Sequence, residues 1–170
     1  GPVYGCEKLS IGPDDTVPEL SEKLAAIGAE LMIRTLDGVI HHGLRPMPQD
    51  NAAATLAPIL KKSHGYLDWN LPAKDIHNRV RAFNPWPGTP TRFRDAICKL
   101  LKTRLTEETI EAAAGTLVAR KGTLSVICGD RRVLEILEIQ PENRKAVSGG
   151  SFANGARIEA GEKFQTLVDN

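Results

Sequence analysis

The sequence lacks long apolar runs and any targeting pattern. No stretch of about 18 consecutive apolar residues occurs, so the sequence predicts no membrane-spanning helix and no membrane partner. The first residues also lack the succession of charged, apolar and small residues that marks a secretory signal peptide. Because 41% of the residues are hydrophobic and 25% are charged, the composition is that of a globular protein, and we expect a cytoplasmic one.

Cysteine and aromatic residues are also scarce. Three cysteines, Cys6, Cys98 and Cys128, are odd in number and far apart, which argues against a disulfide framework and a zinc knuckle. We therefore expect reduced thiols and no bound metal. Two Trp, two Tyr and four Phe are too few for a platform on which successive bases stack. Because neither a nucleophile–base pair nor a metal cluster is apparent, we expect no catalytic residue in this chain.

Charge is plentiful but unevenly distributed along the chain. Residues 1–55 carry four Lys/Arg and eight Asp/Glu, whereas residues 56–104 carry ten Lys/Arg and three Asp. Residues 105–170 are again slightly acidic, with eight Lys/Arg and ten Asp/Glu. A basic middle between two acidic flanks indicates an anionic partner. The alternative is that the acidic flanks neutralise the middle segment in the fold.

Residues 73–83 predict a short amphipathic helix. Its apolar residues recur at helical spacing and share one face: Ala73, Ile76, Val80 and Phe83. Its polar residues lie on the other face: Lys74, Asn78 and Arg81, with His77 beside them. Asn70 or the residue after it is the expected N-cap, and Asn84 ends the helix because Pro85 follows. This basic face beside a proline-rich turn suits a phosphate backbone; the alternative is a helix that fills a core, with Trp86 as its anchor.

The segments before this helix predict one strand, one helix and a linker. Residues 3–11 read as a strand, and Thr16 and Glu19 form a capping-box pair that starts a helix ending near His42, before Gly43. One strand and one helix bury too little surface to fold alone. Residues 47–67 contain recurrent prolines and no firm periodicity, as expected of a linker.

The segments after this helix predict mainly short strands. Residues 93–105, 115–121, 123–128 and 133–139 read as strands, the last with a bulge or burial on both faces. Residues 105–114 are acidic and read as a loop or a helical turn. A short helix over 151–154 and a last strand over 163–168 complete the pattern, which is typical of a small barrel.

Three strings in this sequence resemble the methionyl-tRNA formyltransferase family. They are Asp68-Trp69 followed by Asn84-Pro85-Trp86-Pro87-Gly88, the stretch Gln140-Pro141-Glu142-Asn143-Arg144-Lys145, and the opening Gly1-Pro2-Val3. The resemblance implies a mixed α+β fold, mainly a small antiparallel barrel of the oligonucleotide-binding (OB) type with a short helix. The resemblance also divides the chain into three parts. Residues 1–46 would be a strand–helix remnant of a Rossmann-like formyltransferase catalytic domain, and residues 47–67 a linker. Residues 68–170 would be a C-terminal tRNA-binding domain.

The resemblance also implies a function in translation initiation. Enzymes of this family transfer a formyl group from 10-formyltetrahydrofolate to methionyl initiator tRNA. Their catalytic residues and folate site would precede Gly1, so we expect this chain to be inactive alone and to bind no cofactor. We expect initiator methionyl-tRNA, and not DNA, as its partner. The candidate tRNA-binding residues are basic side chains: Lys61, Lys62, Arg79, Arg81, Lys102, Arg104, Arg144 and Lys145.

Two alternatives remain at the level of sequence. The chain could be the C-terminal structural domain of a related folate-dependent formyltransferase or formyltetrahydrofolate dehydrogenase, which a neutral barrel surface would favour. It could also be a protein-interaction module, which an exposed apolar patch around Trp69 or Trp86 would favour. Under any of these readings, we expect residues 1–46 to dock weakly or to exchange between chains, because a lone strand seeks a partner.

Overall fold

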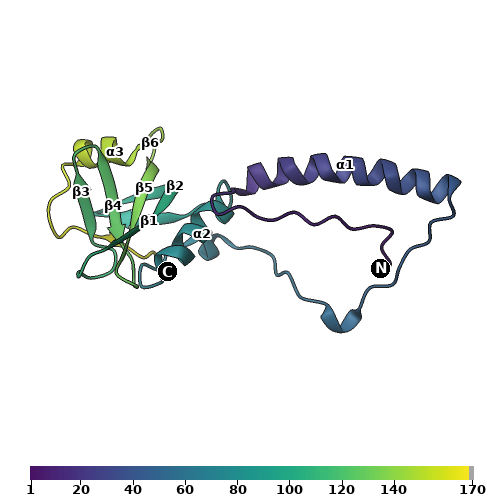
Figure 1. Cartoon of the computed structure of the whole chain (residues 1–170). Coiled ribbons are helices and arrows are strands. Elements are labelled where there is room, and N and C mark those ends of the chain that lie inside the picture. The colour runs from purple at the N-terminus through teal and green to yellow at the C-terminus, as the bar shows by residue number, and fades with distance from the viewer. Residues whose placement is uncertain (169–170) are drawn as a thin grey trace. The chain divides into compact units, whose positions relative to one another are not determined.

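The computed structural model describes residues 1–168, which divide into two compact units, Gly1–Ile59 and the residues from Leu60 on (Figure 1). The first unit contains helix α1 (Val17–His41) and the short 3-10 helix η1 (Asn51–Ala53). The predicted capping box is confirmed, because the Glu19 carboxylate accepts from the Thr16 amide at 2.9 Å and the Thr16 side chain caps the Glu19 amide. Helix α1 ends where Gly43 adopts a φ of +65°, as the sequence predicted.

No residue of the first unit is buried within the described chain. Many apolar side chains along α1 are exposed, and Ile33 and Ile40 keep 69% and 68% of their accessible surface, whereas Leu20, Ile27 and Leu31 are partly buried. The predicted strand over residues 3–11 was wrong. Only Val3 makes a β-type contact, a bridge to Met47, because no second strand of this unit runs alongside to pair with it.

The second unit is a seven-stranded antiparallel sheet with two helices. The strand order is β3-β4-β5-β2-β1-β7, and β6 pairs with β5 outside this path. The elements in chain order are η2 (Lys62–Gly65), α2 (Ala73–Phe83), β1 (Pro90–Phe93), β2 (Ala96–Thr109), β3 (Leu117–Arg120), β4 (Thr123–Ile127), β5 (Arg132–Pro141), β6 (Val147–Ser148), α3 (Gly149–Ala156) and β7 (Phe164–Gln165).

The sheet curls until its two ends meet (Figure 1). Strand β7 pairs with β1 at one end. The segment leading into β7 also contacts the start of β3, through a Thr116–Lys163 bridge and a hydrogen bond from the Phe164 amide to the Gly115 carbonyl at 2.9 Å. The unit is a curled antiparallel half-barrel, and these few contacts bridge its open side.

The hairpins of the sheet agree with the sequence, but several strand boundaries do not. The last strand, predicted over 163–168, is only Phe164–Gln165. The turns at 121–122 and 129–130 and the bulge between β2 and β5 are confirmed. Residues 93–105 are not one strand, because the chain reverses at Arg94, whose φ is +52°. The acidic residues 105–109 are not a loop but the end of β2. They stay extended because β5 pairs with them, and the Thr106 hydroxyl donates to the Val133 carbonyl at 2.6 Å.

The core lies between the curled sheet and α2. Ala73, Ile76 and Val80 are buried, which confirms the predicted apolar face of α2. Trp69, only 3% exposed, stacks on Phe164 with ring centroids 5.5 Å apart. Its indole nitrogen donates to the Thr91 hydroxyl at 3.0 Å, so the buried polar atom is satisfied.

Two predictions about α2 need correction. The helix begins after Pro72 rather than at an Asn70 cap, and its first amide, that of Ala73, donates to the Asp130 carboxylate at 3.1 Å. The cap therefore comes from the turn between β4 and β5. His77 does not lie on the polar face. It is buried, and its Nδ1 lies 2.9 Å from the hydroxyl oxygen of Thr103 on β2, with which it forms a hydrogen bond.

Candidate nucleic-acid interface

The two units carry opposite net charge. Residues 1–59 contain four Lys/Arg and eight Asp/Glu, whereas residues 60–170 contain 18 Lys/Arg and 13 Asp/Glu. The excess of positive charge therefore belongs to one compact unit and not merely to a stretch of sequence. This is the electrostatic setting that an anionic partner requires.

One group of the predicted residues gathers where η2 meets α2. Arg79 on α2 donates to the His64 carbonyl of η2 at 3.4 Å, which ties the helix to the short segment that carries Lys61 and Lys62. Gly65 packs on the Gly88 backbone, so closely that a Cβ at Gly65 would lie within 2.0 Å of the Gly88 carbonyl oxygen. The structure therefore brings Lys61, Lys62 and Arg79 together beside the turn that follows α2.

The turn after α2 is fixed at both ends. The Asn84 side-chain amide donates to the Leu101 carbonyl at 3.1 Å, and the Gly88 amide donates to the Phe83 carbonyl at 2.8 Å. Between them Trp86 keeps 55% of its surface exposed, so it is not the buried anchor that the sequence offered as an alternative. Arg81, near the end of α2, donates to the Asn78 side chain at 2.9 Å.

The sequence did not single out Lys99, which lies beside this turn. Its Cδ is 3.9 Å from where a Cβ at Gly88 would be, and the residue is exposed. Strand alternation was the available signal, because Lys99 stands between the buried residues Cys98 and Leu100.

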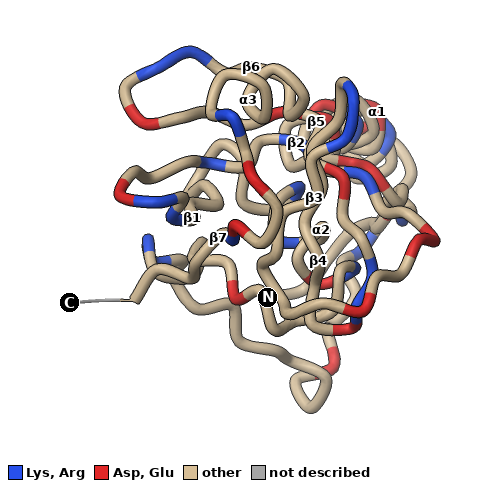
Figure 2. The backbone as a smooth tube through the Cα atoms, turned by 90° about the vertical axis from the view of Figure 1, so that its left-hand side faces the viewer, with Lys and Arg blue, Asp and Glu red and all other residues tan. Residues whose placement is uncertain are grey.

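A second group lies on the outer face of β2. Lys102 and Arg104 are exposed and flank Thr103, which is buried against α2. Arg104 forms a 2.6 Å ion pair with Glu135, and Lys102 lies opposite Glu138 on β5. Figure 2 shows the same pattern along the strands, where Lys/Arg and Asp/Glu positions are interspersed. The charge of this group is therefore largely balanced by its neighbours.

A third group lies on the turn between β5 and β6. Arg144 and Lys145 are both exposed there, and Figure 1 shows β6 and α3 at one end of the sheet and α2 at the other. Asn143 has a φ of +57°, the left-handed conformation that an asparagine tolerates. The Gln140 side chain donates to the Arg144 carbonyl at 3.0 Å and fixes the turn.

Several arginines of this unit are already paired with glutamates. Five arginines contact glutamates within 4.0 Å: Arg94–Glu162, Arg104–Glu135, Arg120–Glu108, Arg131–Glu111 and Arg132–Glu107. Hydrogen bonds from Arg94 and Arg120 lower the pKa of Glu162 and Glu108, respectively. Within residues 1–168, several predicted contact residues form no ion pair: Lys61, Lys62, Arg79, Lys102, Arg144 and Lys145.

Metal-ligand groups and reactive thiols were the other candidates for chemistry in the described residues. No three His, Cys, Asp or Glu side chains within residues 1–168 are grouped as metal ligands would be. Burial, and secondarily Glu142, raises the pKa of the Cys98 thiol to about 11. Burial, and secondarily Asp130, raises that of Cys128 to about 12. None of the helices in this part of the chain combines the length and apolarity of a membrane crossing.

Comparison with known proteins identifies the second unit. The family model for the formyl transferase C-terminal domain matches residues 59–157. A methionyl-tRNA formyltransferase of Solibacter usitatus is 44% identical over 154 residues, 91% of this chain and 49% of that protein. One of Heliobacterium modesticaldum is 37% identical over 164 residues, 92% of this chain and 52% of that protein. The chain thus spans about half the length of these curated relatives.

Solved structures share the fold at lower sequence identity. HypX of Aquifex aeolicus, in complex with tetrahydrofolic acid, matches with a TM-score of 0.66 and 14% identity, over 99% of this chain and 31% of HypX. WlaRD, a sugar 3N-formyl transferase, matches with a TM-score of 0.58 and 16% identity, over 81% of this chain and 48% of WlaRD. The family match covers more than half of the chain. The chain therefore belongs to the formyl transferase family, whose C-terminal domain it contains.

Proposed function

We propose that this chain is the C-terminal part of a methionyl-tRNA formyltransferase and that its second unit binds initiator methionyl-tRNA. The observation that carries the proposal is the 36–44% identity, over most of the chain, to several proteins with that name. The whole enzyme transfers a formyl group from 10-formyltetrahydrofolate to the amino group of methionine on the tRNA. On this proposal the catalytic residues and the folate site belong to the part of the enzyme that precedes Gly1, and this fragment alone is inactive.

The architecture supports a division of labour within that enzyme. The half-barrel corresponds to an OB-like domain, because its two ends meet at residues 115–117 and 162–164. Residues 1–46 correspond to the end of a Rossmann-like catalytic domain, and 47–67 to the linker. Since no residue up to Ile59 is buried, the apolar side of α1 needs a partner, which is the rest of the catalytic domain or, in its absence, the same segment of a second chain.

The second unit would hold tRNA through its basic surface. Lysine and arginine side chains that neutralise phosphates release counterions, which gives a salt-dependent grip that does not depend on sequence. Lys61, Lys62 and Arg79 form the continuous group beside α2, and Arg81 extends it toward the turn. Arg144 and Lys145 form a second contact point at the β5–β6 turn. Lys102 contributes from β2, and Arg104 contributes least because Glu135 already pairs with it.

The other readings lack this support. A neutral barrel surface would have favoured a purely structural domain, but residues 60–170 carry five more Lys/Arg than Asp/Glu. An apolar patch around the tryptophans would have favoured a protein-interaction module. Trp69 is buried and gives no such patch, so this alternative rests on Trp86 alone, which keeps 55% of its surface exposed.

Binding of initiator tRNA to the 170-residue chain across a salt series tests the proposal. We expect log K to fall linearly with log salt, and Lys62→Ala, Arg79→Ala and Lys145→Ala each to weaken binding and reduce the slope by about 1. Lys121→Ala, which removes an exposed charge from the β3–β4 turn, is the matched control and should leave the slope unchanged. Absence of binding at low salt would refute the tRNA-binding role of this chain.

A further inference from the structure

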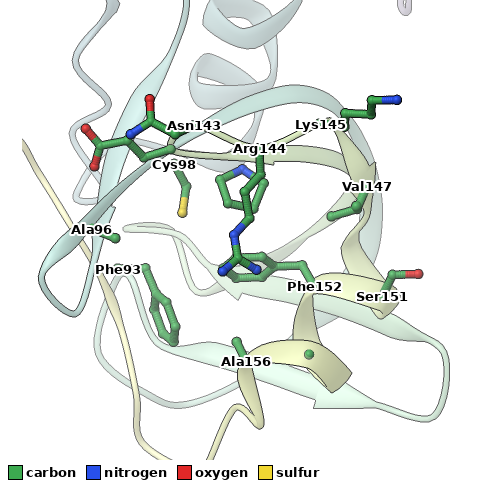
Figure 3. Close-up of a pocket in the computed structure, with 13 residues that line it drawn as sticks. Phe93, Ala96, Cys98, Asn143, Arg144, Lys145, Val147, Ser151, Phe152 and Ala156 are labelled. Atoms are coloured by element: carbon green, nitrogen blue, oxygen red, sulfur yellow. The ribbon is translucent and has the colours of Figure 1, made fainter.

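A cavity lies at the end of the sheet away from α2. It has a volume of about 630 Å³, is open to solvent on one side, and is lined by the β1–β2 hairpin, the β5–β6 turn and α3 (Figure 3). This volume falls in the range of about 300–1,000 Å³ that is typical of small-molecule sites. Nothing in the sequence pointed to it, because its walls come from three separate segments.

The floor of the cavity is aromatic and apolar. Phe93 from β1 and Phe152 from α3 are both buried, and their ring centroids lie 5.5 Å apart at an interplanar angle of 68°. The Cys98 thiol beside them stays neutral at physiological pH, because burial raises its pKa to about 11. Such a floor offers apolar contact to a flat ring. The Arg94 guanidinium, which is paired with Glu162, lies 4.8 Å from the Phe93 ring centroid.

The rim of the cavity is cationic. Figure 3 shows the Arg144 side chain reaching across the cavity toward Phe152, while the Lys145 amine points away from it. Arg144 forms no ion pair within residues 1–168, so its guanidinium is available to a ligand. The nearby Glu142 carboxylate accepts a hydrogen bond from the Ile97 amide at 3.4 Å, and the Glu142 amide donates to the Ile97 carbonyl at 2.9 Å. Glu142 is thus held against the hairpin.

We infer that this cavity takes one unpaired nucleotide of the bound RNA, with its base against Phe93 and Phe152 and its phosphate on Arg144. An aromatic and apolar floor beside the Arg144 guanidinium fits a flat ring that carries an anionic group. The inference rests on the proposed function, and it adds a pocket for one nucleotide to an otherwise phosphate-directed surface. It also agrees with the shortage of aromatic residues, since one pocket needs only two rings whereas a stacking platform needs many.

Gly155 provides a substitution that tests the pocket alone. It lines the cavity on α3, and a Cβ built there would have no heavy atom within 4 Å, so Gly155→Leu adds an apolar side chain at the cavity wall without altering charge. Gly155→Ala is the matched control, because it makes the same change of backbone freedom and adds only one methyl group. Arg144→Gln tests the phosphate contact, with Lys121→Gln as its control at another exposed turn.

The experiment measures initiator tRNA affinity for the 170-residue chain and these variants, with unfolding curves to show that each variant folds. We expect Gly155→Leu to weaken binding at least about fivefold at unchanged salt slope, the loss typical of one stacked base. We expect Arg144→Gln to weaken binding and to reduce the slope by about 1. Both controls should bind as the unaltered chain does. Equal binding by folded Gly155→Leu and Gly155→Ala would overturn the pocket inference and leave the proposed function intact.

A second arm separates a nucleotide within RNA from a free one. Adenosine and uridine 5′-monophosphate are titrated into the isotope-labelled chain while the backbone amide signals of Phe152 and Gly155 are followed by NMR. Perturbation of these signals only at millimolar nucleotide, together with submicromolar tRNA binding that Gly155→Leu weakens, supports the inference. If tRNA does not bind but free nucleotide does, RNA is excluded as the source, and the proposed function fails with it.

Discussion

The substitution Gly129→Ala should strongly destabilise the second unit. Gly129 lies in the turn between β4 and β5, and its amide donates to the Leu71 carbonyl at 2.9 Å. A Cβ at this position would lie 1.8 Å from the carbonyl oxygen of Asn70, whereas Cβ contacts under 3.0 Å essentially never occur. The obstacle is backbone, so no side-chain rotation can relieve it. The turn and the segment before α2 must move apart.

The cost follows from what that movement breaks. Separating the segments by about 1 Å stretches the Gly129–Leu71 hydrogen bond beyond its useful range, a loss of about 1 kcal/mol. It also withdraws Asp130 from the Ala73 amide, and the loss of a helix cap costs about 1 kcal/mol more. Adding about 1–3 kcal/mol for overpacking gives a destabilisation of about 3–5 kcal/mol. That is a large part of the stability of a domain this size.

Urea denaturation followed by tryptophan fluorescence measures this loss, because Trp69 is buried in the affected unit. With a urea m-value of about 1–3 kcal/mol/M, the unfolding midpoint should fall by about 2 M. Gly155→Ala is the control, since a Cβ there meets nothing within 4 Å and alanine favours the helix by about 0.5–1 kcal/mol. A Gly129→Ala midpoint within about 0.2 M of the unaltered chain would refute the reasoning.

Three further predictions concern the core and the thiols. Thr91→Val should destabilise the second unit by about 2 kcal/mol, because it leaves the buried Trp69 nitrogen without its acceptor. Trp69→Phe should cost less, because the Thr91 hydroxyl still donates to the Gln165 carbonyl. Equal losses of unfolding free energy in urea titrations would contradict this. At pH 8 iodoacetamide should alkylate exposed Cys6, while Cys98 and Cys128 react only on unfolding, as peptide mass spectrometry would show. The unfolding free energy should fall as the pH rises from 9, the ordinary thiol pKa, toward 11, because in this range Cys98 and Cys128 ionise only in the unfolded state. The urea midpoint of the unaltered chain should therefore fall with pH. That of Cys98→Ala/Cys128→Ala should not, which would confirm the assignment.

Local patterns predicted much of the fold, and long-range contacts account for the failures. The capping box of α1, the apolar face of α2 and the two tight hairpins depend on neighbouring residues, and all are confirmed. The cap of α2 comes from Asp130, 57 positions after Ala73, so no local reading could find it. His77 is buried for the same reason, because Thr103 on β2 supplies its hydrogen bond.

The candidate site shows the same division. Counting charges along the sequence indicated the basic segment, and the structure assigns the excess of positive charge to one folded unit. Ion pairs between charged side chains on neighbouring strands could not be predicted from a count of charges. The sequence named Arg104 and Lys62 alike as tRNA contacts. Among the described residues Arg104 is paired with Glu135, whereas Lys62 forms no ion pair. The roles of these residues in binding remain predictions.

The pairing of β7 with β1 has a consequence for how the protein is made. A ribosome releases the chain from its amino end, so β1 emerges more than 60 residues before the strand that covers it. Until Phe164 leaves the exit tunnel, the indole of Trp69 has no ring to stack on and one edge of the sheet stays open. The core around Trp69 is therefore incomplete until Phe164 has emerged, and during that interval the unpaired edge of β1 is open to chaperones and to other chains.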